Sequence, residues 1–174
     1  MSRRSSQRGF TAIELMTVLV IAGVLLVLAL PAFNDMLERR RLEGQANEFV
    51  TDLAYAKSEA VQRNRNVVLI TGGGGTCYTL AAWTDSALRT GSCNCANGAG
   101  TSCTPRPPGA NDPLELKTVL LTSTATVTDN VTFDFEPVRG ALVPATAASA
   151  AVAMGSRSYT VLVTAYGRVT PFTP

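Results

Sequence analysis

The sequence predicts an α+β protein in which one long N-terminal helix precedes an antiparallel β-sheet or sandwich domain. The first observation is a nearly unbroken helical pattern over residues 11–62. The second is a series of short β-branched runs, separated by Gly- and Pro-rich turns, that follows residue 66. A chain of 174 residues has room for one membrane helix and one globular domain.

The first part of the predicted helix is strongly apolar. Leu15–Leu30 contains no charged residue, and together with Phe10–Ile13 the run is long enough to cross a bilayer. Glu14 interrupts this run, and a carboxylate in lipid is costly unless it has a partner or snorkels to the interface. Pro31 lies inside the helical pattern, which resumes directly after it, so we expect a kink there rather than an end.

The second half of the helix is predicted to be amphipathic and to pack on the sheet. Its stripe keeps a spacing of three and four residues and consists of Ala46, Phe49, Val50, Leu53, Ala54, Ala56, Lys57, Ala60 and Val61. The charged residues that fall mostly off this stripe are Glu43, Glu48, Asp52, Glu59 and Arg63.

Strands are predicted where β-branched or alternating residues recur. The expected strands cover residues 67–71, 77–83, 114–119, 131–136, 159–164 and 168–170. Gly72–Gly75 lacks the lysine of a phosphate-binding loop and is expected to be a hairpin turn. A long loop is expected over residues 84–113, and Ala145–Ala153 is expected to be a low-complexity connection to the last pair of strands.

Four cysteines point to disulfide bonds. They are Cys77, Cys93, Cys95 and Cys103, and three of them fall in the 84–113 loop. The low content of charged residues, 16%, and a C-terminal half rich in Thr, Ser, Gly and Ala suit an extracytoplasmic β domain. An even number of cysteines in such a domain favours disulfides, and the spacing does not match a zinc knuckle or ribbon. Four cysteines allow three pairings, and strain disfavours the one that joins Cys93 to Cys95. The other two pairings remain open, and either would fasten the loop.

The composition excludes several classes of site. The chain has no histidine, which removes His-containing catalytic triads and His-ligated metals. No nucleophile–base pair is apparent, so we expect no catalytic residue, metal or cofactor. The net charge of +2 includes three arginines before Gly9, and without them the chain is near neutral.

The N-terminal order of basic head, Gly9, Phe10, Thr11 and Glu14 resembles that of type IV prepilins and type II secretion pseudopilins. The resemblance implies that a prepilin peptidase cuts after Gly9 and methylates Phe10, and that Glu14 and Pro31 serve filament assembly. The alternative is an ordinary signal peptide or signal anchor. Such a signal has its small-residue cleavage site after the apolar run, whereas here the glycine precedes it.

Three later segments resemble the GspH/FimT group of minor pilins and pseudopilins. They are the helix phrase Ala56–Asn64 with the strand Val67–Ile70, the pattern Phe133-x-Phe135-x-Pro137-x-x-Gly140, and Tyr159–Val169 with its terminal Gly167-Arg168-Val169. The resemblance divides the chain into a leader at 1–9, a transmembrane or pilus-core helix at 10–33, its amphipathic continuation at 34–66, and a β domain at 67–174.

This resemblance implies a non-enzymatic minor pilin of a bacterial type IV pilus, acting as a priming or tip subunit. Its implied partners are other major and minor pilins, the prepilin peptidase and the inner membrane. The chain would cross that membrane once with its C-terminal domain in the periplasm, and then reach the pilus. An H-type minor pseudopilin of a type II secretion system is the alternative.

A DNA-binding pilin for natural transformation is a hypothesis of a different class. The last 38 residues contain no acidic side chain but include Arg139, Arg157 and Arg168. Some FimT-type members resemble this chain in having a C-terminal Gly-Arg-x-Arg motif, but Thr170 replaces the second arginine here. Three arginines supply few phosphate contacts, so we expect weak DNA binding at most, and solvated arginines at strand ends are the simpler interpretation.

Overall fold

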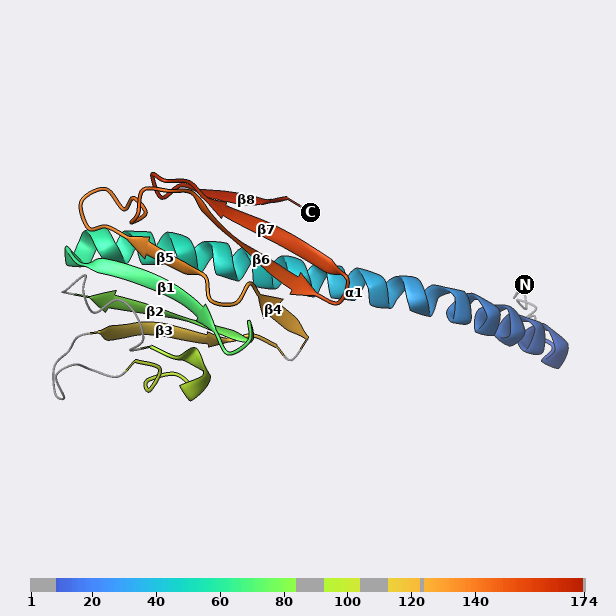
Figure 1. Ribbon diagram of the computed structural model, residues 1–174. Helices are drawn as coiled ribbons and strands as arrows, with labels where there is room; N and C mark the ends of the chain where they lie inside the picture. The colour runs from blue at the N-terminus through green and yellow to red at the C-terminus, as the bar shows by residue number, and fades with distance from the viewer. Residues whose placement is uncertain (1–8, 84–92, 104–112, 123, 174) are drawn as a thin grey trace, which may run out of the picture. The chain divides into compact units, whose positions relative to one another are not determined.

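The computed structural model describes residues 9–83, 93–103, 113–122 and 124–173 (Figure 1). The chain divides into two compact units, Met1–Arg39 and Arg40–Pro174. Helix α1, Ala12–Arg63, begins in the first unit and ends in the second, which confirms the predicted helix to within a residue at each end. It continues through Pro31, as expected. In the described part of the chain, no helix has the combination of length and apolar character that a membrane span requires.

The described residues of the second unit form two four-stranded antiparallel sheets, which confirms the predicted fold class. The first sheet has the order β3-β2-β1-β5, with β1 at Asn66–Gly72, β2 at Cys77–Trp83, β3 at Leu114–Leu120 and β5 at Thr132–Phe135. The second has the order β4-β6-β7-β8, with β4 at Ala125–Val127, β6 at Ala148–Met154, β7 at Arg157–Val163 and β8 at Val169–Thr173.

One hydrophobic core joins the second half of α1 to both sheets. Phe49 makes edge-on ring contacts with Tyr78 of β2 at 5.2 Å and with Phe133 of β5 at 6.2 Å. The helix side chains in this core confirm the predicted stripe in part, since Ala46, Phe49, Leu53, Ala56 and Ala60 are buried. Leu42, which was not part of the predicted stripe, is buried with them. Ala54 and Val61 are exposed instead. The strands contribute the other core side chains, because alternate residues of a strand point to the same face. In β7, for example, Tyr159, Val161 and Val163 point into the core.

Two expectations for the β domain were wrong, and one strand was missed. Ala145–Ala153 is no mere connection, because β6 occupies most of it and lies between β4 and β7. Small alanines alternate with buried Val152 and Met154 there, and pairing with two strands outweighs their low β-propensity. The short strand β4 was not predicted. The alternation over residues 131–136 predicts a half-exposed strand, but Phe133, Asp134 and Phe135 are all buried. Residues 84–92 and 104–112 of the expected loop lie outside the described residues.

Candidate functional site

The N-terminal motif lies at the very start of α1. Thr11 precedes the helix, and its hydroxyl accepts a hydrogen bond from the backbone N–H of Glu14 at 3.3 Å. This is the first half of a capping box, and it places Glu14 in the first turn, where the helix dipole favours a carboxylate. Phe10 is 84% exposed, and no ion pair joins Glu14 to any residue that the structure describes. Among the described residues, therefore, capping accounts for the backbone of Glu14 but not for its carboxylate.

The three later motifs meet at Lys57, although they are far apart in sequence. The Lys57 ammonium donates to the carbonyl oxygens of Tyr166 at 3.3 Å and Gly167 at 3.1 Å. Gly140 lies against the stem of the same side chain, so that a Cβ there would be 2.6 Å from Lys57 Cγ. A Cβ on Gly167 would overlap the carbonyl oxygen of Gly140. The helix phrase thus fastens the β5–β6 turn and the β7–β8 turn together.

These two turns carry the most exposed large apolar side chains among the described residues of the second unit. Val138 is 76% exposed and Tyr166 is 84% exposed. Arg139 and Arg168 flank them and are also exposed. Arg157 is not part of this surface, because it begins β7, at the end of that strand opposite the β7–β8 turn. The predicted arginine set is therefore divided, with two members on touching turns and one elsewhere.

A buried carboxylate on α1 was missed from the sequence. Asp52 is only 4% exposed. Its carboxylate accepts a hydrogen bond from the Tyr78 hydroxyl at 2.8 Å and pairs with the Lys117 ammonium at 2.8 Å, while Glu48 lies 3.6 Å from the same ammonium. Asp52 follows Phe49 by three residues and precedes Ala56 by four, so its place beside the stripe was the available signal.

This network shifts the proton affinity of its members. Burial, the Asp52 charge and the hydrogen bond to Asp52 raise the pKa of Tyr78 well above its ordinary value, so the phenol stays protonated. Burial lowers the pKa of Lys117, but hydrogen bonds and attraction from Asp52 and Glu48 outweigh it and leave that pKa raised. The arrangement fixes α1 to β2 and β3 and gives no nucleophile or general base.

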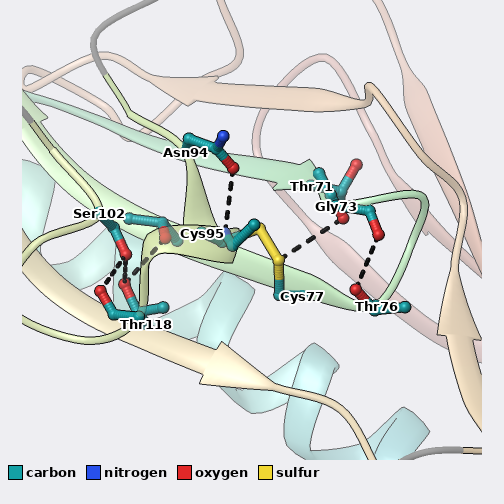
Figure 2. The surroundings of a disulfide bond; sticks show 12 residues. Thr71, Gly73, Thr76, Cys77, Asn94, Cys95, Ser102 and Thr118 are labelled. Atoms are coloured by element: carbon teal, nitrogen blue, oxygen red, sulfur yellow. Dashed lines mark hydrogen bonds between the residues drawn. A yellow bond between two sulfur atoms is a disulfide. The ribbon is translucent and has the colours of Figure 1, made fainter.

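The cysteines form two disulfides, which confirms the prediction and resolves the pairing. Cys77 is bonded to Cys95 and Cys93 to Cys103, with separations of 18 and 10 residues, and no cysteine is free. Figure 2 shows the Cys77–Cys95 disulfide, which joins the start of β2 to the bridged loop, as we call residues 93–103. This loop contains the short 3-10 helix η2, Cys95–Asn97. Cys93 and Cys103 pack against a second apolar cluster made of Val68, Ala81 and Trp83.

The bridged loop is also held by Glu115 of β3. Its carboxylate accepts hydrogen bonds from the backbone N–H groups of Gly100 at 2.7 Å and Ser102 at 2.9 Å, and from Thr118 at 2.7 Å. Burial raises the pKa of Glu115, but these hydrogen bonds outweigh it and leave the pKa lowered.

Comparisons with known protein families match almost the whole chain. Residues 45–167 match the family described as type II transport protein GspH. Residues 4–30 match the prokaryotic N-terminal methylation motif. The first match takes in the first two motifs that meet at Lys57 and the third as far as Gly167, and the second match takes in Gly9, Phe10 and Glu14.

Individual relatives share shorter segments. A fimbrial protein of Pseudomonas aeruginosa is 33% identical over 87 residues, which cover 50% of this chain and 55% of that protein. The pilin-like protein PilA1 of Thermus thermophilus is 41% identical over 73 residues, covering 40% of this chain and 46% of that protein. The chain thus spans about half the length of the relatives it matches.

Among solved structures, the type IV minor pilin FimU of Pseudomonas aeruginosa superposes with a TM-score of 0.54. The sequence identity is 20%, and the superposition covers 79% of this chain and 91% of that one. At this identity the likeness concerns the fold.

Proposed function

The chain belongs to the GspH family of type II transport proteins, and we propose that it is a non-enzymatic minor pilin of a bacterial type IV pilus, acting as a priming or tip subunit. The observation that carries this proposal is the methylation motif, which ends in an apolar helix with one carboxylate in its first turn. A β domain without a nucleophile–base pair among its described residues suits a subunit that is displayed.

The proposal includes the processing of the N-terminus and its anchoring in the membrane. A prepilin peptidase cuts after Gly9 and methylates Phe10, and residues 10–33 hold the chain once across the inner membrane with its β domain in the periplasm. The uncharged run Leu15–Leu30 supports this membrane role. Assembly then moves the same helix from lipid into the filament core beside other major and minor pilins.

Glu14 is the residue on which assembly is proposed to depend. In an apolar filament core its carboxylate needs a cationic partner, and an N-terminal amine of a subunit supplies one. Pro31 is proposed to serve assembly by shaping the same helix.

The test is to follow Glu14→Gln in the source bacterium, with Glu38→Gln as a matched control outside the apolar run. We expect Glu14→Gln to be inserted and processed normally but largely lost from sheared filaments, and Glu38→Gln to be incorporated as in wild type. An immunoblot of membranes and filaments measures both. Normal incorporation of Glu14→Gln would remove the proposed assembly role.

The second candidate is an H-type minor pseudopilin of a type II secretion system, which the description of the matched family favours. The two candidates differ in the filament that contains the chain. Deleting the gene and scoring surface pili and protein secretion separately distinguishes them, because only one of these should be lost.

A third candidate, DNA capture, is favoured by the two exposed arginines on touching turns. Because Arg139 and Arg168 supply few phosphate contacts, we expect a dissociation constant of roughly 10⁻⁴ to 10⁻⁶ M at physiological salt, rising steeply with salt. Titration of duplex DNA at two salt concentrations, with Arg168→Ala beside wild type, measures this. Tight binding that requires Arg168 would place DNA capture first.

A further inference from the structure

A cleft of about 410 Å³ lies beside the bridged loop. Its lining includes one row of register partners across the first sheet, namely Thr132 of β5, Ile70 of β1 and Thr79 of β2. The bridged loop contributes Asn94, and the turn before β5 contributes Asn130. The volume falls in the range of small-molecule sites in proteins, roughly 300 to 1,000 Å³.

The side of this cleft formed by the bridged loop is fixed in place. Both disulfides have at least one cysteine in the bridged loop, and Cys93 and Cys95 line the cleft. Asn94 is held on both sides, since its backbone N–H donates to Ser102 O at 2.6 Å and its side-chain oxygen accepts from Ala96 N at 3.0 Å. Figure 2 shows Asn94, Thr71 and Gly73 around the Cys77–Cys95 disulfide. A ligand would therefore meet a preformed surface, which lowers the entropic cost of binding.

The chemistry of the lining is polar but uncharged. No acidic or basic side chain is among the residues that line the cleft. Within the described part of the chain, no hydrogen bond uses the Asn94 amide N–H₂, the Thr132 hydroxyl or the Asn130 side-chain oxygen. These groups offer donors and acceptors together, while Ile70 and the disulfide sulfurs offer an apolar surface.

We propose that this cleft is a binding site for a neutral saccharide. Hydroxyl groups both donate and accept, which matches the mixed amides and hydroxyls of the cleft, and the apolar face of a sugar ring matches Ile70 and the disulfide. Anions and cations are disfavoured because the lining has no charge to compensate them. The site goes beyond the proposed assembly role, which uses the N-terminal helix.

The test uses the full chain in lauryldimethylamine oxide, a detergent without a sugar headgroup. The probes are lactose, cellobiose, maltose and N,N′-diacetylchitobiose, followed by saturation-transfer difference NMR. We expect at least one to bind with a dissociation constant on the order of 1 mM, since the lining has no aromatic ring to strengthen the contact. No saturation transfer to any of the four at about tenfold that concentration overturns the proposal.

Two variants locate the site, and a third controls for the change. Asn94→Asp keeps the acceptor for Ala96 N but removes the amide donors, and Thr132→Val removes one hydroxyl; each should weaken binding by about three- to tenfold. Thr160→Val makes the same change on the exposed face of β7 and should leave binding unchanged. Near-UV circular dichroism confirms that all three fold. If Asn94→Asp and Thr132→Val bind the saccharide as tightly as the wild-type chain, the proposal is overturned. Equally tight binding of the anion glucuronate overturns it too.

Discussion

Gly167 and Gly140 decide whether the two motif-bearing turns can touch. Both have positive φ, at 69° and 63°. At Gly167 the space for a Cβ is occupied by a backbone carbonyl, whereas at Gly140 it is occupied by the flexible stem of Lys57. The glycines of the two motifs are thus explained by packing, independent of any ligand. The sequence indicated turns at both positions, but only the fold reveals that the turns meet.

Gly167→Ala should therefore be far more destabilising than the same change at Gly155, which has a φ of 60° but open space around it. Both pay about 1–2 kcal/mol for the left-handed backbone, and Gly167→Ala adds about 1–3 kcal/mol for the forced shift of Gly140. Urea unfolding of the detergent-solubilised chain measures the difference. Equal losses for the two variants would show that the turns do not pack as described.

Asp52 is the residue that sequence reasoning placed wrongly, because a carboxylate next to an apolar stripe is normally solvated. Here the Tyr78 hydroxyl and the Lys117 ammonium compensate its burial. Tyr78 and Lys117 come from strands that are distant from Asp52 in sequence. Their positions beside Asp52 depend on a strand register that the sequence did not specify.

Lys117→Met should lower the free energy of unfolding by about 1–3 kcal/mol, because it leaves a buried carboxylate with a single neutral donor. Arg40→Met is the matched control, since its pair with Glu43 spans 3.6 Å and the arginine side chain is 70% exposed. That control should change stability by less than about 0.5 kcal/mol. If the two variants behave alike, the Asp52 network contributes no more than an ordinary surface ion pair.

At the scale of elements, the long helix and the β1–β2 and β7–β8 hairpins were predictable from periodicity and turn residues. The strands β4 and β6 were not, because alanine-rich segments have weak β-propensity and become strands through pairing with neighbours. The bridged loop is an intermediate case. Its cysteines predicted disulfides, but the choice between two pairings required the position of Cys77 at the start of β2.

Each disulfide should contribute about 2–4 kcal/mol by restricting the unfolded chain. Replacing Cys77 and Cys95 together by alanine should cost slightly more than replacing Cys93 and Cys103, because the first bridge closes 18 residues and the second 10. Urea midpoints of the two double variants test this, with thiol titration of the wild-type chain expected to give no free cysteine. Unchanged midpoints in both variants would mean that the loop is fastened by other contacts.

The hold of Glu115 on the bridged loop should weaken in acid. Because its pKa in the folded chain is lowered from 4.5, the ionised form stabilises the fold above that value, and this contribution is lost as the pH falls through the lowered pKa. Glu115→Gln should remove the contribution of this carboxylate to the pH dependence of the free energy of unfolding. The contributions of the other titrating groups should stay. The free energy of unfolding of the wild-type chain and of Glu115→Gln is measured between about pH 3 and pH 6. If the two curves run parallel, Glu115 does not contribute to the acid dependence.

At the scale of the whole molecule, the N-terminal motif and the β domain point to one function through different evidence. The motif was evident in the sequence because peptidase recognition and methylation require particular residues at fixed spacing. The exposed surface of Val138 and Tyr166 and the cleft beside the bridged loop could not be predicted, because each brings together residues from several elements. The contacts of the β domain therefore depend on the folded chain, whereas the proposed route to a filament depends on the first helix.

We propose that this chain is a processed filament subunit, and the intact mass of the chain in purified filaments is the sharpest test of that proposal. We expect sheared, detergent-washed pili to contain a minor species that begins at Phe10 and has one methyl group on its terminal amine. Its mass should also match two closed disulfides. A chain found only in membranes with residues 1–9 retained, or absent from filaments while other minor pilins are present, would contradict the account.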